Sequence, residues 1–220
     1  MIRRAAERSL STRFGGWQEI LYTGEKGAGE KRSIITLVCG DVRAKDNVPC
    51  RVHSTCLSAH VLNSAECDCR EQMAIAQKYI SEQGYGLVII LDQDGKGNGH
   101  LALMQAAKMA SEESIPQSEA YQRLGFKRDA RDYAEAAEVL TELGVCSIEL
   151  LTNNPDKEIG LKSLGITIVA TRQVALDLEN FPELKRYYDE KAEQGHNVAV
   201  RLCLRGDDHN DHRSTCRFEP

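Results

Sequence analysis

The sequence lacks any apolar run that approaches the roughly 20 residues of a membrane-spanning helix. Its N-terminus carries Arg3 and Arg4, but no apolar stretch follows them. A secretory signal needs such a stretch directly after its basic residues. We therefore expect a cytoplasmic protein without a membrane partner.

Aromatic residues and positive charge are also scarce. Only 5% of the 220 residues are aromatic, with a single Trp, and the net charge is −5. Proteins that hold single-stranded nucleic acid stack its bases on aromatic side chains, and DNA-binding proteins present a basic surface. We expect no nucleic-acid partner. An anionic small molecule is compatible with this composition, because a local group of Arg, Lys and backbone amides binds phosphate even on an acidic protein.

The order of apolar runs and turn residues predicts an α/β fold, a mixed sheet with flanking helices. The expected strands cover residues 35–39, 49–53, 86–91, 147–151 and 166–170, and the expected helices cover residues 70–83, 100–113, 130–143, 155–164 and 181–195. We expect three parts along the chain. They are an N-terminal segment over residues 1–34 that ends in a flexible polar loop (24–33), a main domain over residues 35–195, and a polar C-terminal tail over residues 196–220.

Eight cysteines are present, and three of them are spaced like metal ligands. In a reducing cytoplasm a disulfide framework is not expected. Cys67 and Cys69 are two residues apart, and Cys56 lies eleven residues before Cys67. Three thiolates leave one position of a tetrahedral zinc open, as a catalytic zinc requires for its water. A structural zinc completed by His53 or His60 fits the spacing equally well.

Polar clusters follow the predicted strands. The Gly-rich segment 94–99 comes after an apolar strand and before a helix, where glycines allow close backbone approach and the helix N-terminus favours an anion. An ordinary strand-to-helix loop fits this segment as well. Asp129 and Arg131 stand at a predicted helix start, where a carboxylate is most often an N-cap. Segment 152–157 follows another strand, and open α/β sheets bind ligands at such strand ends.

Together these motifs resemble the GTP cyclohydrolase II family, which performs the first step of riboflavin synthesis. The resemblance rests on five segments with the family's order and spacing: RVHSTC (51–56), CDCREQ (67–72), QDGKGNG (93–99), LGFKRDARDY (124–133) and LLTNNPDK (150–157). It covers roughly residues 35–195. The resemblance therefore implies that the main domain is a catalytic domain.

The resemblance implies a homodimer and a zinc ion held by Cys56, Cys67 and Cys69. In the family, the zinc-bound water attacks C8 of the guanine imidazole ring, formate leaves, and Mg²⁺ assists with the triphosphate. Asp129 looks like the family's proton acceptor, and Arg131 looks like the arginine that takes the nucleotidyl group when pyrophosphate leaves. The positions that resemble the family's nucleotide contacts are Arg51, Val52, His53, Ser54, Thr55, Gln72, Asp94, Gly95, Lys96, Gln117, Thr152 and Lys157.

Several positions depart from the family pattern on the side expected to contact the base. Thr55 stands where the family has Glu. Lys96 stands where the family has Arg, so a bidentate fork becomes a point charge. Ala107 aligns with the family's catalytic tyrosine, and Ala cannot transfer a proton. Gln117 aligns near a family threonine. We interpret this pattern as metal-dependent ring hydrolysis with an altered substrate or an altered stopping point.

Three functions remain open at this point. The first is a divergent GTP cyclohydrolase that converts GTP to a formylated or deformylated pyrimidine nucleotide; the lack of the tyrosine is compatible with an early stop at the formylated product. The second is ring opening of a uridine nucleotide in pyrimidine catabolism, since uracil has no imidazole C8 and needs no guanine-specific contacts. The third is a non-catalytic nucleotide-binding protein. The retention of three cysteines together with Asp129 and Arg131 speaks against the third, because a dead site has no need of an open zinc.

Overall fold

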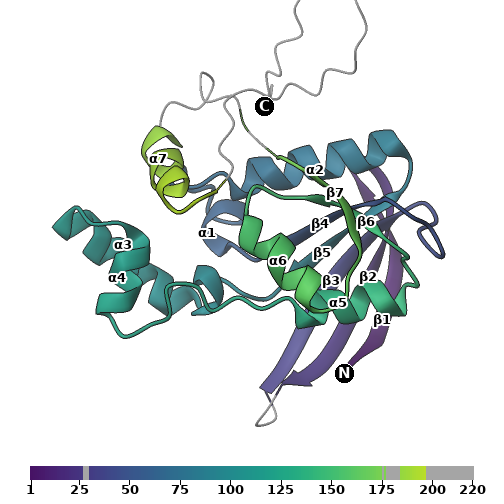
Figure 1. The fold of residues 1–220 in the computed structure, drawn as a ribbon, viewed down its shortest axis with the longest axis horizontal. Helices are drawn as coiled ribbons and strands as arrows, with labels where there is room; N and C mark the ends of the chain where they lie inside the picture. The colour runs from purple at the N-terminus through teal and green to yellow at the C-terminus, as the bar shows by residue number, and fades with distance from the viewer. Residues whose placement is uncertain (27–29, 175, 177–183, 197–220) are drawn as a thin grey trace, which may run out of the picture.

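The computed structural model describes residues 1–26, 30–174, 176 and 184–196. Its centre is a seven-stranded sheet in the order β1-β2-β3-β5-β4-β6-β7 (Figure 1). The strands are β1 (Ile2–Thr12), β2 (Gly15–Lys26), β3 (Glu30–Cys39), β4 (Val48–Ser54), β5 (Gly86–Leu91), β6 (Ile148–Leu151) and β7 (Ile168–Arg172). The helices are α1 (Leu57–His60), α2 (Cys69–Gln83), α3 (His100–Glu113), α4 (Gln117–Arg123), α5 (Ala134–Glu142), α6 (Pro155–Ser163) and α7 (Lys185–Glu193), with a 3₁₀ turn, η2 (Gly95–Gly97). The predicted α/β fold with a mixed sheet and flanking helices is confirmed.

The sheet has an antiparallel half and a parallel half. β1, β2, β3 and β5 pair in antiparallel fashion, whereas β5, β4, β6 and β7 run parallel. The shared strand is β5, in which Val88 pairs with Leu37 of β3 on one side and with Arg51 of β4 on the other. Because β4, β5 and β6 are parallel, their carboxyl ends meet at one edge of the sheet, where open α/β sheets bind ligands.

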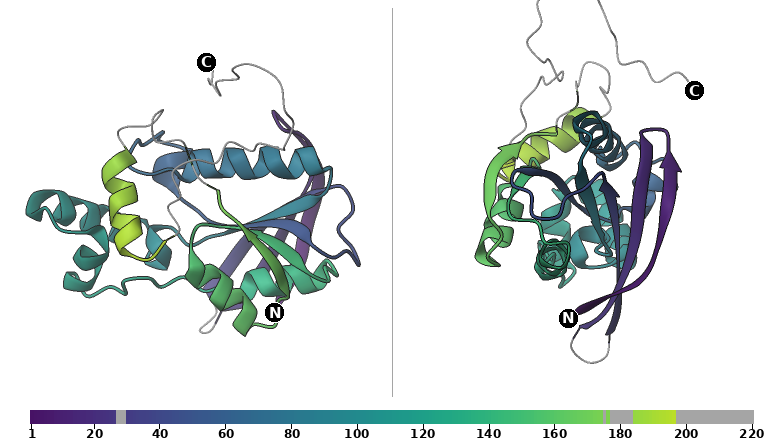
Figure 2. Two further views of the ribbon diagram at one scale, coloured as in Figure 1. Left: turned by 45° about the horizontal axis from the view of Figure 1, so that its top comes forward. Right: turned by 90° about the vertical axis from the view of Figure 1, so that its right-hand side faces the viewer.

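Two helical layers cover the central strands. Within β5, Leu87 and Ile89 pack in the same apolar cluster as α5 and α6, whereas Val88 packs with α2. Figures 1 and 2 show α2 along one face of the sheet, with α5 and α6 along the other. A strand buried on both faces needs apolar residues at every position. This explains the unbroken apolar sequence of β5.

The α3–α4 hairpin stands apart from these layers. Its apolar contacts are internal, between Ala102 and Ala106 of α3 and Ala120 and Tyr121 of α4. The hairpin projects beyond the edge at which β4 and β5 end (Figure 1). α7 lies beside it and also packs against α2 through the apolar cluster that contains Tyr188. These two units flank the sheet edge.

The predicted flexible loop over residues 24–33 is wrong, because strands occupy most of it. β2 extends to Lys26, β3 begins at Glu30, and Gly24 pairs with Arg32. This part of the hairpin extends beyond the apolar core and is held by backbone hydrogen bonds. Its side chains are polar, so its sequence does not show the alternation of apolar and polar residues that predicts a strand. The division of the chain at residues 34 and 195 stays a prediction, although residues 2–26 add two strands to the sheet. The predicted tail lies outside the described residues except for His196.

Several other elements differ from the predicted ones. α5 begins at Ala134 rather than at residue 130, because the preceding segment docks on the Gly-rich loop, where the N–H of Ala130 donates to the carbonyl of Lys96 at 2.8 Å. α4 was not predicted, because Pro116 is also a turn residue; here it is the N-cap of the helix. None of the helices in the described part of the chain has the length and apolar character of a membrane span.

Candidate active site

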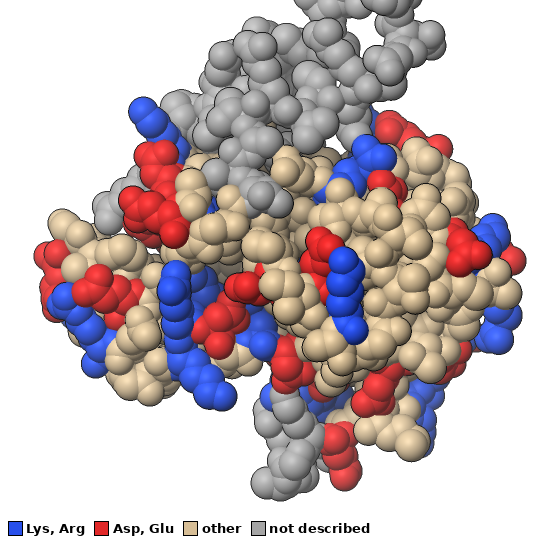
Figure 3. Space-filling model, in the orientation of Figure 1, with Lys and Arg blue, Asp and Glu red and all other residues tan. Residues whose placement is uncertain are grey.

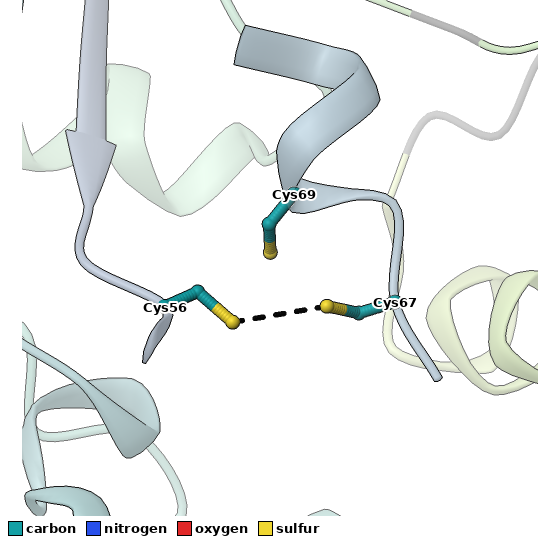
Figure 4. Close-up of side chains that lie close together, drawn as sticks. All are labelled: Cys56, Cys67 and Cys69. Carbon is teal, nitrogen blue, oxygen red and sulfur yellow. Dashed lines mark hydrogen bonds between the residues drawn. The ribbon is translucent and has the colours of Figure 1, made fainter. Parts of the chain in front are cut away.

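Three cysteines converge where β4 ends and α2 begins (Figure 4). Their sulfur atoms point toward one another and all lie within 4.8 Å of one another. The Sγ atoms of Cys56 and Cys67 are 3.8 Å apart, and Cys69 opens α2 beside them. Two thiolates on one tetrahedral zinc, each at about 2.3 Å, are separated by about 3.8 Å. The cluster therefore has the dimensions of a zinc site.

His53 and His60 do not complete this cluster. Their Nε2 atoms lie 2.9 Å apart, so the two rings hydrogen-bond to each other. Among the described residues, the group of atoms that could hold a metal contains the three cysteines alone. Three protein ligands are usual in catalytic zinc sites, whereas structural sites have four. This geometry favours the catalytic interpretation over the structural one.

The three thiols are close enough to share one charge. The hydrogen bond from Cys67, followed by that from Cys69, lowers the pKa of Cys56. Its contact with Cys56 raises the pKa of Cys67. A divalent cation favours the thiolate form of all three, because only thiolates are metal ligands.

Arg51 is buried and lies within electrostatic reach of Cys69. Its guanidinium donates to the carbonyl of Leu151 at 2.9 Å and to Gln72 Oε1 at 2.5 Å. Gln72 donates in turn to Asp68 Oδ2 at 2.5 Å. Burial lowers the pKa of Arg51, and the charge of Asp68 partly opposes this effect. Gln72 is therefore a bridge between a buried cation and a buried carboxylate.

Asp68 connects this network to α7. Its Oδ2 accepts from the Tyr188 hydroxyl at 2.6 Å, and its Oδ1 lies 3.1 Å from Lys191 Nζ. Sequence reasoning missed all three residues. Asp68 could have been noticed because it lies between two predicted ligands, Cys67 and Cys69. Tyr188 and Lys191 carry no local signal, since only the fold brings α7 to the start of α2.

Lys157 is a second buried cation, only 4% exposed. Its Nζ donates to the carbonyl of Val52 at 2.6 Å, while the side chain of Val52 packs in the core. Burial, followed by the charges of Arg51 and Arg131, lowers the pKa of Lys157 well below 10.5. In the described part of the chain, neither Arg51 nor Lys157 forms an ion pair with a carboxylate. Two buried cations without such a partner favour an anionic ligand nearby.

Asp129 and Arg131 form an ion pair with each other. Arg131 Nη2 lies 2.5 Å from Asp129 Oδ2, and its Nε lies 3.0 Å from Oδ1. Burial disfavours the charged form of each group, but the hydrogen bonds between them outweigh burial. The pKa of Asp129 is therefore lowered, and the pKa of Arg131 is raised. Lys96 belongs to the same charged group, because burial, followed by the charge of Arg131, lowers its pKa to about 8. Lys96 Nζ donates to Gln194 Oε1 at 3.3 Å.

Positive charge accumulates between the α3–α4 hairpin and the body of the molecule. Figure 3 shows Lys and Arg side chains on this side, with Asp and Glu side chains among them. Burial, followed by the charges of Lys191, Arg131 and Lys96, lowers the pKa of His196 to about 4. On a chain with net charge −5, this local excess of cations is suited to phosphate groups.

A cavity of about 810 Å³ opens beside Cys56. Thr55, Asp94 and His100 line it together with the two paired histidines. The Thr55 hydroxyl is already engaged, since it accepts from the backbone N–H of Gln93 at 3.1 Å and lies 3.4 Å from Asp92. Thr55 therefore braces the loop after β5.

Buried polar atoms without a partner gather at the same sheet edge. Within the described residues, they include Arg51 Nε, Ser54 Oγ, Gln93 Oε1, Tyr121 OH and Asn154 Nδ2. Leaving such an atom unpaired costs about 1–3 kcal/mol, so native structures keep few of them. Tyr121, which sequence reasoning also missed, lies under the Gly-rich loop: a Cβ atom on Gly95 would be 3.3 Å from its hydroxyl. A bound ligand or water accounts for a cluster of unpaired atoms at this edge.

Two further predicted residues, Thr152 and Gln117, lie on opposite sides of the site. Thr152 follows β6 and is buried, and its hydroxyl accepts from the N–H of Asn154 at 3.1 Å. Gln117 is the first residue of α4, and the Oγ of the next residue, Ser118, lies 3.5 Å from Gln194. Gln117 thus belongs to the hairpin side of the site, whereas Thr152 belongs to the sheet side.

The family model described as GTP cyclohydrolase II matches residues 3–173. The chain belongs to this family. Among curated relatives, the riboflavin biosynthesis protein RibBA of Bacillus mycoides (strain KBAB4) is 38% identical over 197 residues, 89% of this chain and 48% of the relative. RibBA of Chlorobium phaeovibrioides (strain DSM 265 / 1930) is 33% identical over 200 residues, 90% of this chain and 47% of the relative. The chain spans about half the length of the curated relatives it matches.

Membership of the GTP cyclohydrolase II family confirms the resemblance and changes its extent. The match starts at residue 3 and includes the β1–β2 hairpin, and it ends at residue 173, before α7. A solved structure of RibBX, a two-domain 3,4-dihydroxy-2-butanone 4-phosphate synthase from A. baumannii, is similar over 77% of this chain and 40% of its own, with 18% identity and a TM-score of 0.42.

Proposed function

We propose that this protein hydrolyses a ring C–N bond of a nucleotide base and holds a zinc ion on Cys56, Cys67 and Cys69. The observation that carries the proposal is the position of the cysteine cluster, between a cavity and a group of buried cations. Cys69 lies within electrostatic reach of Arg51, while Cys56 lines the cavity. A nucleotide has the same two-sided chemistry, with an anionic end and a planar base.

Each side of the cluster has its own task in this proposal. Arg51 and Lys157 bind phosphate oxygens, which gives two buried cations the counter-charge they lack. Zinc, when bound, supplies a Lewis acid and lowers the pKa of a water to about 7. Asp129 is the proton acceptor at Arg131, which takes the nucleotidyl group if pyrophosphate leaves. Both roles require the ion pair between Asp129 and Arg131 to open, because in this structure the two side chains are bonded to each other.

Mg²⁺ accompanies the phosphates in this proposal. The described residues contain no further cluster of three carboxylate, His or Cys ligands besides the cysteine site. Mg²⁺ commonly binds through substrate phosphates with few protein ligands, so its absence from the protein's own ligand sets is compatible with this role. We further propose that the enzyme is a cytoplasmic homodimer, as the family resemblance implies.

GTP is the first candidate substrate, because the chain belongs to the GTP cyclohydrolase II family. The similar RibBA proteins are named for riboflavin biosynthesis, and we propose a related purine ring opening here. A reaction that stops at a formylated pyrimidine suits a chain with Ala at position 107, where the family has its tyrosine. In that case the base gains one water and keeps its formyl carbon.

A uridine nucleotide is the second candidate, and Thr55 is the observation that favours it. Guanine offers N–H donors that a carboxylate reads well. Thr55 has no carboxylate, and its hydroxyl is engaged with Gln93 and Asp92. His53 and Asp94 also line the cavity near Cys56, and each is engaged with another side chain, His60 and His100 respectively.

The test is a panel of nucleotides incubated with zinc-loaded protein and Mg²⁺ in heavy-oxygen water and followed by mass spectrometry. GTP that gains one water, with or without loss of formate, supports the first candidate. A uridine nucleotide that gains one water supports the second. The Cys67→Ser variant is the matched control and should be inactive on the same substrate. Binding without any chemical change would refute the hydrolysis and support a non-catalytic protein.

A further inference from the structure

Asp94 and His100 form a hydrogen-bonded pair on the wall of the cavity that contains Cys56. The Nδ1 of His100 lies 2.7 Å from Asp94 Oδ2. The other carboxylate oxygen, Oδ1, accepts from the backbone N–H of Gly95 at 2.9 Å. Asp94 is therefore fixed at both oxygens, and His100 at one ring nitrogen.

This contact determines which ring nitrogen of His100 is free. A carboxylate accepts hydrogen bonds, so Nδ1 carries the proton and the neutral ring presents an unprotonated Nε2. No described residue forms a hydrogen bond with this Nε2, and the side chain of His100 is 33% exposed. A carboxylate on one nitrogen and an accessible base on the other is the arrangement by which histidine moves protons in hydrolytic enzymes.

The other titratable groups of the cavity are less suited to this task. His53 and His60 use their Nε2 atoms on each other, and burial lowers the pKa of both rings. Asp92 is exposed and lies 3.4 Å from the Thr55 hydroxyl. His100 thus combines a fixed tautomer, an available nitrogen and a place in the same cavity as the cysteine cluster.

We propose that His100 carries protons in the hydrolysis and that Asp94 is its positioning residue; the inference rests on the proposed function. As the water oxygen bonds to the ring carbon, one water proton passes to His100 Nε2. At the same time, the π pair of the attacked carbon moves to its doubly bonded nitrogen or oxygen. When the ring C–N bond breaks, its electron pair stays on the leaving nitrogen, and His100 returns the proton to that nitrogen. The second water proton passes from the hydroxyl to the nitrogen that took the π pair, or stays on the new carboxyl group where the attacked carbon is a carbonyl. One water is consumed, and nothing is oxidised or reduced.

A purely structural role for the pair is the competing explanation. Asp94 also anchors the Gly-rich loop, because its carbonyl accepts from the N–H groups of Gly97 and Gly99 at 3.0 and 2.9 Å. Asn98 braces the same loop through Nδ2, which donates to the carbonyl of Lys127 at 2.9 Å. Asn98 has no group that moves protons. The Asn98→Ala variant is therefore a matched control for the loss of bracing alone.

The experiment compares the zinc-loaded full chain with His100→Ala, Asp94→Asn and Asn98→Ala on the nucleotide that the panel shows to be hydrolysed. For His100→Ala we expect kcat to fall by about 100- to 10,000-fold, the usual contribution of a positioned acid or base. We expect its KM, zinc content and Tm to stay near the parent values. Added imidazole should restore part of its kcat, and should not raise that of Asp94→Asn or Asn98→Ala.

Two results would overturn the inference while leaving the proposed function intact. One is a His100→Ala variant whose kcat stays within about threefold of the parent. The other is a loss of kcat that imidazole does not restore and that Asn98→Ala reproduces, which would assign the pair to loop bracing. A parent protein that turns over no nucleotide overturns both the proposed function and this inference.

Discussion

The cysteine cluster makes a prediction that needs no knowledge of the substrate. The three sulfurs come from the end of β4, the following loop and the first residue of α2, so a zinc ion on them ties a central strand to the helix that covers it. A ligand that binds only the folded state at 100 times its Kd adds about 2.7 kcal/mol to the free energy of unfolding. For a chain of this size that corresponds to a rise in Tm of roughly 5–11 °C.

Cys67→Ser tests this coupling. The substitution removes one of three thiolates, and we expect the zinc-dependent rise in Tm to fall below about 2 °C at the same buffered zinc, a loss of most of the linkage energy. Cys146 is exposed and lies outside the cluster, so Cys146→Ser is the matched control and should keep the full rise. The assay is thermal unfolding in buffered zinc and in chelator, with metal content measured on the same samples.

The reasoning fails if Cys67→Ser binds one zinc per chain and keeps the full rise in Tm. That result would place the metal elsewhere and leave the 3.8 Å contact between Cys56 and Cys67 as ordinary packing of thiols. Equal loss of zinc in Cys67→Ser and Cys146→Ser would equally contradict the assignment, because the two substitutions would then act through general instability.

Four further predictions concern single side chains. Lys157→Met removes a buried cation that has no carboxylate partner in the described structure, so the free energy of unfolding should stay level or rise by about 1–4 kcal/mol. Nucleotide affinity, measured by calorimetry, should fall about 10- to 150-fold. Unchanged affinity would contradict the role of Lys157 in phosphate binding. Burial lowers the pKa of Lys96 from 10.5 to about 8. Between these pH values the unfolded chain binds more protons than the folded protein, so the free energy of unfolding rises with pH, while nucleotide affinity falls because Lys96 loses its charge. Lys96→Arg should abolish both trends in denaturant and binding titrations, and a Lys96→Arg protein that keeps them would exclude Lys96 as their source. Tyr121→Phe removes a buried hydroxyl without a partner in the described structure, so Tm should rise by a few degrees, roughly 1 kcal/mol; a lower Tm would mean that the hydroxyl has a stabilising partner. Arg131→Lys keeps the charge beside Asp129 but not the guanidinium, so pyrophosphate release should disappear in a phosphate-release assay; full release would assign Arg131 to binding alone.

Local sequence patterns predicted the parts of the fold that depend on local physics. β5 and α3 have their predicted bounds because an apolar run between turns and a helical spacing after glycines are complete signals in themselves. The β1–β2 hairpin carries no such signal, because most of its outer strand is exposed and its pairing depends on backbone hydrogen bonds. The segment before α5 was predicted as helix because nothing local shows that Ala130 bonds to Lys96.

The candidate site divides in the same way. Cys56, Cys67 and Cys69 are close in sequence, so their spacing predicted their convergence. The bond from Tyr188 to Asp68 joins residues 120 positions apart, and no pattern near either residue predicts it. Contacts of this kind depend on how α7 crosses the start of α2, which is set by tertiary packing rather than by propensity.

The charges and hydrogen bonds of the site distinguish the residues that match the family pattern from those that depart from it. Arg51 and Lys157 are buried cations that lack a carboxylate partner within the described residues, and such groups are expensive to keep unless a ligand neutralises them. On the cavity side, the hydroxyl of Thr55 and the carboxylate of Asp94 are committed to protein partners. Under the proposed function, the cations that would bind the phosphates are kept at an energetic cost, whereas Thr55 and Asp94 are not free to contact a base.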